Sequence, residues 1–212
     1  GDGDGLGIGA GHFVAAGRRN VDLLYILYDN EVYGLTKGQA GPTLGLGEKT
    51  KSLPKPNPQG RINPLLLAFA SGYTWIGRGY AYDVKGLKEL IKEGMGHRGL
   101  AFLHVLQPCP TYNDLHTREW FAPRLYNLQE EGYDPQVPPG LPPEALDRRM
   151  ALFQEKALEW GERIPVGVFW KAEAPTFEER LRAYLPRYPE VYPARGPEEP
   201  LDLEGLLQEF AL

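Results

Sequence analysis

The chain has 212 residues, of which 42% are hydrophobic, so it is long enough to bury one substantial core and short for two. Its formal net charge is −5 with acidic and basic residues interspersed, which argues against a face that binds nucleic acid. It contains no apolar run of membrane-spanning length and one cysteine, Cys109, so we expect no membrane insertion, no internal disulfide and a reducing, cytoplasmic setting.

The first two thirds of the sequence alternate apolar runs with helical segments. The run VDLLYILY over residues 21–28 is continuously apolar, as in strands that are buried on both faces of a parallel sheet. Asn63 and Asp83 stand where helix N-caps are expected, and Gly94 stands where a helix ends. We expect strands over residues 21–28, 73–82 and 100–106, and helices over residues 63–71 and 83–94. This order predicts an α/β fold with a doubly wound, mostly parallel sheet.

The last third has a different composition. Residues 134–143 form a proline-rich connector, and residues 144–160 follow as an amphipathic helix. The apolar stripe of that helix consists of Leu146, Met150, Phe153, Ala157 and Trp160. Further expected elements are a strand over residues 166–170, a helix that opens with the capping box Thr176–Glu179, and an amphipathic tail over residues 201–212.

These features predict two parts of unequal size. Residues 1–133 are expected to form the α/β domain, with an N-terminal part of it missing from this sequence, which starts inside a glycine-rich motif without a preceding strand. Residues 134–212 are expected to form a C-terminal extension that packs on the same domain or on a partner subunit.

The chain opens with GDGDGLGIGAG, which several motifs match only in part. A calcium loop of the EF-hand type needs an oxygen ligand where Leu6 stands, and a P-loop needs Gly-Lys-Ser/Thr. A dinucleotide fingerprint fits Gly5, Gly7 and Ala10, with Asp29 at the end of the next strand. That interpretation leaves the acidic residues of the opening stretch without a role. A helix-entry turn with solvated acidic side chains is a further alternative.

Another interpretation uses more of these residues. Asp29-Asn30 begin 26 positions after Gly3, and this arrangement resembles the diphosphate-binding motif of thiamine diphosphate enzymes. A diphosphate needs a divalent cation, and Mg²⁺ prefers oxygen ligands in an octahedron that includes phosphate oxygens. Glycines let the backbone approach the phosphates, and the helix that follows directs N–H groups at them. Ligands bind at the carboxyl ends of the strands in such sheets, where Asn30 and Cys109 both fall.

The next loop makes the resemblance specific. The stretch DNEVYGLTKGQAGPT over residues 29–43 resembles the beta subunit of 2-oxoacid:ferredoxin oxidoreductases. That family has an asparagine, then Tyr-Gly-Leu/Met-Thr, then Gly-Gln and a Pro-Thr run. The resemblance extends from Gly1 through Gln107-Pro108-Cys109, about half of the chain. It implies the thiamine diphosphate-binding fold of that family.

The resemblance also implies which residues form the cofactor site. Asp2, Asn30 and the backbone carbonyl of Val32 would hold Mg²⁺. The residues that it places around the diphosphate are Gly1, Asp2, Gly3, Asp4, Gly5, Asn30, Val32, Gly34, Leu35 and Thr36. Lys37 would face the substrate and pair with its carboxylate. An ordinary turn hydroxyl for Thr36 and a solvated surface lysine for Lys37 stay open as alternatives.

Cys109 has two interpretations. The family binds a [4Fe–4S] cluster through four cysteines, and Cys109 in Gln-Pro-Cys-Pro matches the fourth of them. The other three lie before the glycine motif in the family and are absent from this sequence, so this chain by itself cannot complete the cluster. Without the family, a single cysteine after a buried strand is most often an inert core residue.

The implied function is that of one subunit of a larger enzyme. With its alpha subunit it would convert a 2-oxoacid and coenzyme A to an acyl-CoA by oxidative decarboxylation, and pass the electrons through the cluster to ferredoxin. Pyruvate, 2-oxoglutarate and branched-chain 2-oxoacids all stay open as substrates. The alternatives are a subunit of a non-oxidative thiamine diphosphate decarboxylase or synthase, a dinucleotide-binding module, and a structural partner that binds neither cofactor.

Overall fold

The computed structural model describes residues 1–185, 188 and 208 of the chain. The chain divides into two compact units, residues 1–177 and residues 178–212. The division expected after residue 133 does not coincide with this boundary, because residues 134–177 belong to the first unit and supply strands to its sheet. The amphipathic tail expected over residues 201–212 lies outside the described residues, apart from Gln208.

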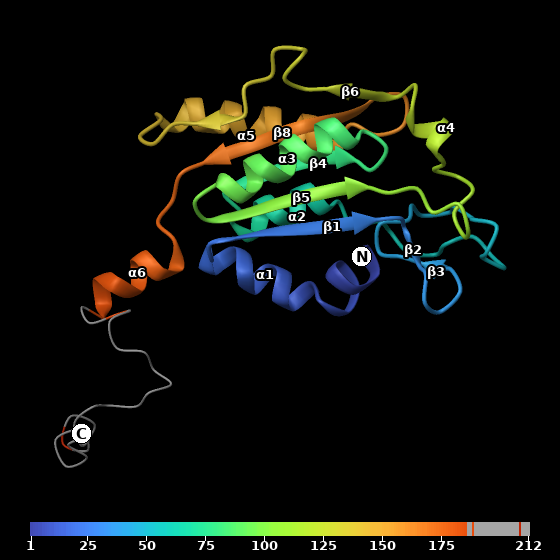
Figure 1. The fold of residues 1–212 in the computed structure, drawn as a ribbon, viewed down its shortest axis with the longest axis horizontal. Helices are drawn as coiled ribbons and strands as arrows, with labels where there is room; N and C mark the ends of the chain where they lie inside the picture. Colours follow the sequence, from blue (N-terminus) through green and yellow to red (C-terminus); the bar gives the residue numbers. More distant parts are fainter. Residues whose placement is uncertain (186–187, 189–207, 209–212) are drawn as a thin grey trace. The chain divides into compact units, whose positions relative to one another are not determined.

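One sheet organises the first unit (Figure 1). Its strands are β1 (Leu23–Asp29), β4 (Trp75–Tyr80), β5 (Leu100–Leu106), β6 (Leu125–Asn127), β7 (Gln136–Val137) and β8 (Ile164–Ala172). The order is β1-β5-β4-β8-β6, with β7 also paired to β8. β1, β5 and β4 are parallel, whereas β8 runs antiparallel to β4 and carries β6 and β7 parallel to itself. The mostly parallel sheet expected from the sequence is confirmed, and β8 is its antiparallel addition.

Helices cover both faces of this sheet, which confirms the doubly wound arrangement. The main helices are α1 (Ala10–Arg19), α2 (Pro64–Ser71), α3 (Val84–Gly96) and α5 (Pro143–Leu158). One core cluster joins Phe13 of α1, Leu65 of α2 and Phe153 of α5 to the first face. The other cluster packs Leu87 and Leu90 of α3 on the opposite face. Among the helices of the described residues, none has the length and apolar character needed to cross a bilayer.

Local sequence signals account for several helix ends. Asn63 accepts hydrogen bonds from the backbone N–H groups of Leu65 and Leu66 at the start of α2, and Asp83 accepts one from Gly86 at the start of α3. Trp160 does not continue the stripe of α5, because that helix ends at Leu158. Trp160 packs instead in a separate cluster that includes Phe121 of the short helix α4 (Arg118–Phe121).

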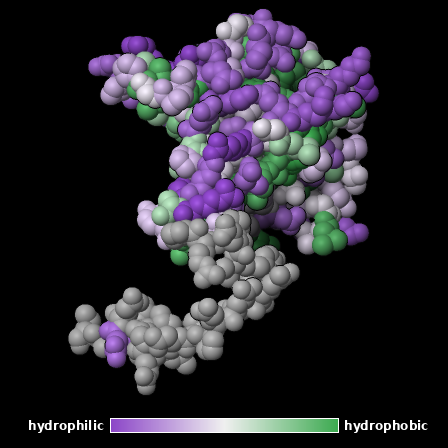
Figure 2. Space-filling model, turned by 60° about the vertical axis from the view of Figure 1, so that its left-hand side comes forward, coloured by the Kyte–Doolittle hydropathy of each residue, from purple (hydrophilic) through white to green (hydrophobic). Residues whose placement is uncertain are grey.

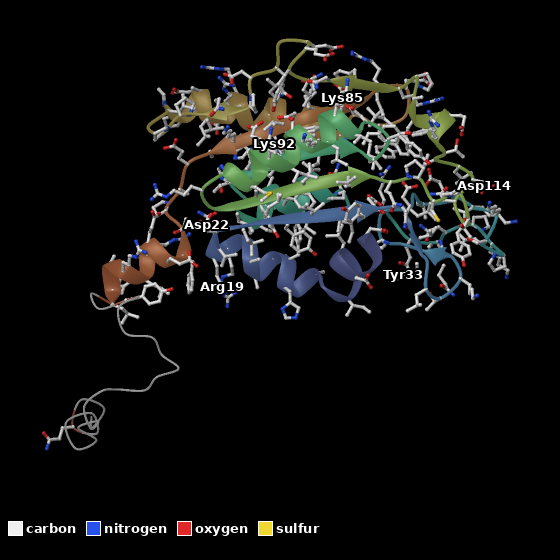
Figure 3. The ribbon with its side chains drawn as sticks, in the orientation of Figure 1. Arg19, Asp22, Tyr33, Lys85, Lys92 and Asp114 are labelled. Carbon is white, nitrogen blue, oxygen red and sulfur yellow. The ribbon has the colours of Figure 1, made fainter. Side chains whose placement is uncertain are left out.

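The glycine-rich start of the chain forms a helix of its own. Residues Gly3–Ile8 make a π-helix, η1, which leads directly into α1. Near the carboxyl ends of β1 and β5, β2 (Val32–Tyr33) and β3 (Gln39–Ala40) form a small antiparallel pair. Figure 3 shows Tyr33 and Asp114 among the loops at this end, whereas Arg19 and Asp22 lie at the other end of the sheet.

One face of the molecule is mainly polar. Figure 2 shows this face, on which hydrophilic side chains predominate and apolar side chains gather in smaller groups. Large apolar side chains that are exposed include Ile8, Leu35 and Leu46 in the glycine-rich start and the loops after β1. The last helix of the described residues, α6 (Phe177–Tyr184), begins directly after the expected cap Thr176.

Candidate functional site

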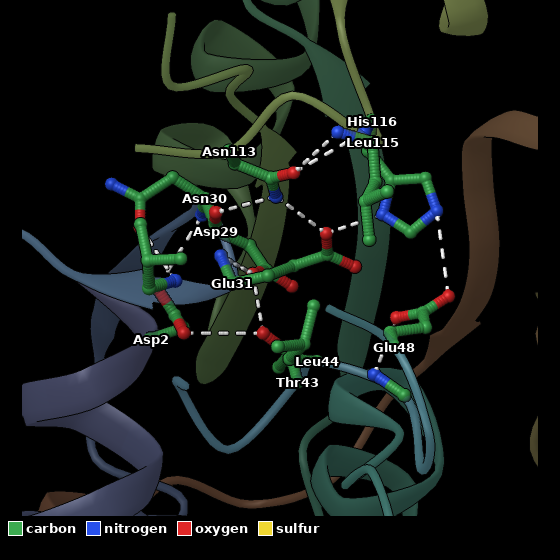
Figure 4. Close-up of polar contacts among 12 residues, drawn as sticks. Asp2, Asp29, Asn30, Glu31, Thr43, Leu44, Glu48, Asn113, Leu115 and His116 are labelled. Atoms are coloured by element: carbon green, nitrogen blue, oxygen red, sulfur yellow. Dashed lines mark hydrogen bonds and ion pairs between the residues drawn. The ribbon is translucent and has the colours of Figure 1, made fainter. Parts of the chain in front are cut away.

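Asp2 and Asn30 meet beyond the carboxyl end of β1. The Asp2 carboxylate is buried, and its Oδ1 accepts a hydrogen bond from the backbone N–H of Asn30 at 3.3 Å (Figure 4). The side-chain oxygen of Asn30 accepts a bond from the N–H of Val32 at 3.1 Å, which fixes the turn that leads into β2. Residues 28 positions apart therefore form one polar site, because β1 ends beside the start of η1.

A second buried carboxylate, Asp29, lies next to Asp2. The Thr43 hydroxyl lies 2.6 Å from Asp29 Oδ1 and 3.1 Å from Asp2 Oδ2. Burial and then the negative charge of Asp29 raise the pKa of Asp2 to about 7. Burial also opposes ionisation of Asp29, but hydrogen bonds from His104 and Thr43 outweigh it and hold the pKa of Asp29 below its usual value. Asp29 is therefore the ionised member of the pair at neutral pH.

His104 and Arg78 extend this network into the centre of the sheet. The Arg78 Nε–H donates to His104 Nδ1 at 3.1 Å, so the imidazole proton lies on Nε2 and is donated to Asp29 Oδ2 at 2.7 Å. Burial lowers the pKa of His104, which keeps the ring neutral, and lowers the pKa of Arg78 to about 9, which leaves it charged at pH 7. No local sequence pattern connects His104 to Asp29, because the two residues lie 75 positions apart on neighbouring strands.

The residues of this site fit a divalent cation. Asp2 offers a carboxylate, Asn30 an amide oxygen and Val32 a backbone carbonyl, all of which are oxygen ligands that Mg²⁺ accepts. A cation would offset the negative charge that Asp2 and Asp29 concentrate in one buried place. A Cβ atom at Gly41 would lie 2.3 Å from Asp2 Oδ2, so the wall of the site has no room for a side chain there.

The opening glycines have neighbours that the sequence did not reveal. A Cβ atom at Gly3 would lie 2.5 Å from the Tyr33 ring, and one at Gly5 would lie 2.7 Å from the Tyr25 hydroxyl. Side chains at these positions would therefore collide with tyrosines, so the structure requires glycine at both positions even without a bound ligand. Asp4 turns outward, since its side chain is 89% exposed. A Cβ atom at Gly1 would have only ordinary contacts, at 3.7 Å or more.

The segment Gly34-Leu35-Thr36-Lys37 forms the exposed turn between β2 and β3. Leu35 is 97% exposed. Lys37 has a φ of 81°, in the left-handed region that few residues other than glycine adopt. Val32, by contrast, is buried beside Asn30. Val32, at the base of the turn, donates its backbone N–H to the Asn30 side chain.

Cys109 lies in the loop after β5 and is half-buried. Asn113 connects this loop to the site: its N–H donates to the Cys109 carbonyl at 3.0 Å, and its side-chain amide donates to the Asn30 carbonyl at 3.2 Å. The same amide donates to a carboxylate oxygen of Glu31 at 2.9 Å. The loop that bears Cys109 is thus fastened to the turn that bears Asn30.

Two family models match the chain in succession. Residues 1–105 match the thiamine pyrophosphate enzyme, C-terminal TPP binding domain, and residues 109–185 match the C-terminal part of the pyruvate ferredoxin oxidoreductase beta subunit. The first contains the Asp2–Asn30 site, and the second begins at Cys109. Together they cover both the sheet and much of the segment that was expected to be a C-terminal extension.

Curated relatives agree with these family models. The chain is 57% identical over 197 residues to a 2-oxoacid:ferredoxin oxidoreductase subunit beta of Sulfolobus sp, with 92% of this chain and 64% of the relative covered. It is 54% identical over 216 residues to the subunit of the same description from Saccharolobus solfataricus, with 99% and 70% covered. The chain thus spans about two thirds of the length of these relatives.

A solved structure shares the fold. It is a 2-oxoglutarate:ferredoxin oxidoreductase from Magnetococcus marinus with 2-oxoglutarate, coenzyme A and succinyl-CoA bound. The TM-score is 0.79 at 29% sequence identity, and the match covers 100% of this chain and 66% of that one. Its likeness to the present fold agrees with the family models and the curated relatives. The chain therefore belongs to the 2-oxoacid:ferredoxin oxidoreductase subunit beta family and has its thiamine diphosphate-binding fold.

Proposed function

We propose that this chain, in a complex with an alpha subunit, catalyses oxidative decarboxylation of a 2-oxoacid to its acyl-CoA and passes the electrons to ferredoxin. The observation that carries the proposal is the meeting of Asp2 and Asn30 at the carboxyl end of β1. Family membership supports the same activity, because the relatives that the chain matches are described as 2-oxoacid:ferredoxin oxidoreductases.

In this proposal Asp2, Asn30 and the Val32 carbonyl hold Mg²⁺, and the ion holds the diphosphate of thiamine diphosphate. When bound, thiamine diphosphate supplies the electron sink that decarboxylation of a 2-oxoacid requires. The chain's own residues bind and orient: the Thr43 hydroxyl and the backbone N–H of Asn30 contact the Asp2 carboxylate. Gly1, Gly3, Asp4, Gly5, Gly34, Leu35 and Thr36 are proposed to surround the diphosphate.

Lys37 is proposed to pair with the substrate carboxylate. Its exposed position in the turn after Tyr33 leaves the ammonium group available to a ligand or a partner chain. A lysine there favours a dicarboxylic or broad range of 2-oxoacids, because its flexible stem lets the ammonium group pair with carboxylates at different positions in the substrate.

Cys109 is proposed to be one ligand of a [4Fe–4S] cluster. The other three thiolates would come from cysteines that this sequence does not contain, since Cys109 is the one cysteine among its 212 residues. Coenzyme A and ferredoxin are the further partners in this proposal. The low cysteine content supports a reducing, cytoplasmic setting.

The experiment that tests the cofactor site is a calorimetric titration of the complex with thiamine diphosphate, with and without Mg²⁺. We expect Mg²⁺-dependent binding that is lost in Asp2→Asn. Asp147→Asn is the matched control, because it makes the same chemical change at an exposed position of α5. Binding that is equally tight without Mg²⁺, or in Asp2→Asn, would contradict the proposed site.

Ligand titrations and ferredoxin reduction separate the three alternative functions. A dinucleotide-binding module would bind NAD without Mg²⁺, and a structural subunit would bind neither compound. A non-oxidative decarboxylase would bind thiamine diphosphate with Mg²⁺ but would reduce no ferredoxin. Ferredoxin reduction in the presence of coenzyme A and each candidate 2-oxoacid therefore completes the test.

A further inference from the structure

A second group of ligand-type side chains lies beside the Asp2–Asn30 site, and the function proposed above does not use it. The group consists of Glu31, Glu48 and His116, whose ligand atoms all lie within 4.8 Å of one another (Figure 4). Glu31 and His116 are buried. The Glu48 side chain is 30% exposed, so one edge of the group is open to solvent.

The imidazole of His116 is oriented by a carboxylate. Its Nδ1 lies 2.5 Å from Glu31 Oε2, which also accepts the Asn113 amide bond. A carboxylate that accepts the N–H of one ring nitrogen fixes the tautomer and leaves the other nitrogen as a ligand. Metal-binding histidines are held in this way, with Nε2 directed at the ion.

The spacing between His116 and Glu48 suits two ligands of one ion. Nε2 of His116 lies 3.7 Å from Glu48 Oε1, which is too long for a hydrogen bond. Two ligand atoms that each lie about 2.0–2.2 Å from one ion are separated by up to about 4 Å. Glu48 is aimed at this position, because its Oε2 accepts a 2.6 Å bond from the backbone N–H of Gly45.

Glu31 contributes an oxygen that has no partner. Its Oε1 is buried and accepts no hydrogen bond, and the side chain as a whole is more than nine-tenths buried. An unpartnered buried carboxylate oxygen costs free energy that a protein seldom leaves uncompensated. A pocket lined by Asn30, Glu31, Asn113 and His116 adjoins it. A water molecule bound to a cation that is ligated by Glu48 and His116 Nε2 would donate to this oxygen, while Glu31 Oε2 keeps its contact with Nδ1.

We propose that His116 Nε2 and Glu48 bind a divalent metal ion, with Glu31 as the carboxylate that orients His116, at a site that is separate from the Mg²⁺ site at Asp2 and Asn30. One imidazole and one carboxylate favour a borderline ion such as Zn²⁺ over Mg²⁺, with water in the remaining positions. The ion would join the loop at Glu48 to the loop that bears Cys109, and Glu31 would connect both to the turn after β1. The proposal does not depend on the oxidoreductase activity.

The competing account is an ion pair in which a protonated His116 donates to both glutamates. It predicts weak binding of Zn²⁺ that releases a proton, because both ring nitrogens then carry protons and the ion must displace one of them. The two accounts therefore differ in a direct binding measurement at a pH at which histidine metal sites normally load.

The test is a calorimetric titration of the chelator-treated complex with Zn²⁺, in excess Mg²⁺ and without thiamine diphosphate. The pH is about 7.5, roughly one unit above the usual histidine pKa. We expect one Zn²⁺ to bind per chain. His116→Gln or Glu48→Gln should weaken this binding by about 100-fold or more, which exceeds the roughly 10–100-fold effect of losing a residue that only hydrogen-bonds to a metal ligand. His12→Gln is the matched control, since it removes an exposed histidine on α1. Co²⁺ is the second probe, because its visible absorption reports a nitrogen-and-oxygen site of low coordination in the unmutated chain.

Each result decides between the accounts. Absence of stoichiometric Zn²⁺ binding overturns the proposal, as does equal binding in Glu48→Gln or an octahedral, water-like Co²⁺ spectrum. If His116→Gln does not fold, the Glu48→Gln titration and the Co²⁺ spectrum still decide. Asp2→Asn should keep Zn²⁺ binding while it loses Mg²⁺-dependent thiamine diphosphate binding, so failure of one site is distinguishable from failure of the other.

Discussion

At Thr43 a single hydroxyl proton faces two buried carboxylates. The hydroxyl oxygen lies 2.6 Å from Asp29 Oδ1 and 3.1 Å from Asp2 Oδ2, and its proton can be donated to only one of them. Asp29 has a second donor in His104, whereas Asp2 has a weaker backbone contact at 3.3 Å. Because Asp2 has fewer hydrogen-bond donors than Asp29, a nearby cation would stabilise the ionised form of Asp2 more than that of Asp29.

The raised pKa of Asp2 predicts pH-dependent Mg²⁺ binding. Because a proton competes with the ion for Asp2, Mg²⁺ affinity of the complex should be about tenfold lower at pH 6 than at pH 8, on either side of the pKa of about 7. Without Mg²⁺, the stability that this protonated carboxyl contributes is fully present below 3.8, its usual pKa, and is lost as the pH rises through about 7. Calorimetry at both pH values checks this, and Asp2→Asn should remove the difference. Equal affinities at pH 6 and pH 8 would show that Asp2 is not the titrating ligand.

The neutral His104 between Arg78 and Asp29 predicts a large effect on stability. His104→Asn removes the bridge and leaves a buried guanidinium and a buried carboxylate apart, so we expect a loss of about 3–5 kcal/mol in the free energy of unfolding. Denaturant unfolding measures this loss. His12→Asn, on the exposed face of α1, should change the free energy of unfolding by less than about 0.5 kcal/mol. A loss below about 1 kcal/mol for His104→Asn would mean that the pair is not held as the geometry indicates.

At the scale of secondary structure, the site depends on how closely α1 and α2 approach. A Cβ atom at Gly17 of α1 would lie 2.5 Å from the Ser71 carbonyl oxygen at the end of α2. That atom belongs to the backbone, so a rotamer change cannot relieve the contact. Since α1 continues directly from η1, the packing of α1 on α2 also positions the segment that carries Asp2.

Two glycines of the same helix therefore predict opposite effects of alanine. Gly17→Ala should cost about 1–3 kcal/mol of stability, because the two helices must move apart. Gly11→Ala should add up to about 1 kcal/mol, because its Cβ would have no neighbour within 4 Å and alanine favours the helix. Thermal unfolding of both variants checks the pair, and a stabilising Gly17→Ala would contradict the close approach.

At the scale of the whole molecule, the last third of the first unit completes the sheet. β8 lies between β4 and β6, and its residues Phe169 and Val168 enter the core clusters on the two faces. A chain that stops before β8 would leave β4 as an exposed edge and would open both faces of the core. The proline-rich segment over residues 134–143 is thus a connection within one unit, and it contains β7.

This arrangement predicts where the chain tolerates truncation. Residues 1–177 should unfold in one cooperative transition, because they contain every strand of the sheet. Residues 1–133, the domain expected from the sequence, should lack a cooperative transition, because β8 is missing. Circular dichroism during heating compares the two. A cooperative transition in the 1–133 chain would restore the boundary predicted from the sequence.

Local sequence patterns predicted the elements that depend on interactions between residues close together in the chain. Continuous apolar runs identified β1 and β5, and cap residues identified the starts of α2 and α3. The pairing of Asp2 with Asn30 was also expected, because the family resemblance carries that spacing. Trp160 was misassigned because a helical stripe can be extended by periodicity past the residue at which the helix ends.

The sequence by itself determined the family, the α/β alternation and the Asp2–Asn30 pair, since each follows from residues close together or from a motif of known spacing. Only the tertiary structure decided that β8 runs antiparallel to β4, that His104 holds Asp29 and that His116 faces Glu31. Those contacts join residues 75 and 85 positions apart. Their partners are set by the order and direction of strands, which local propensity does not encode.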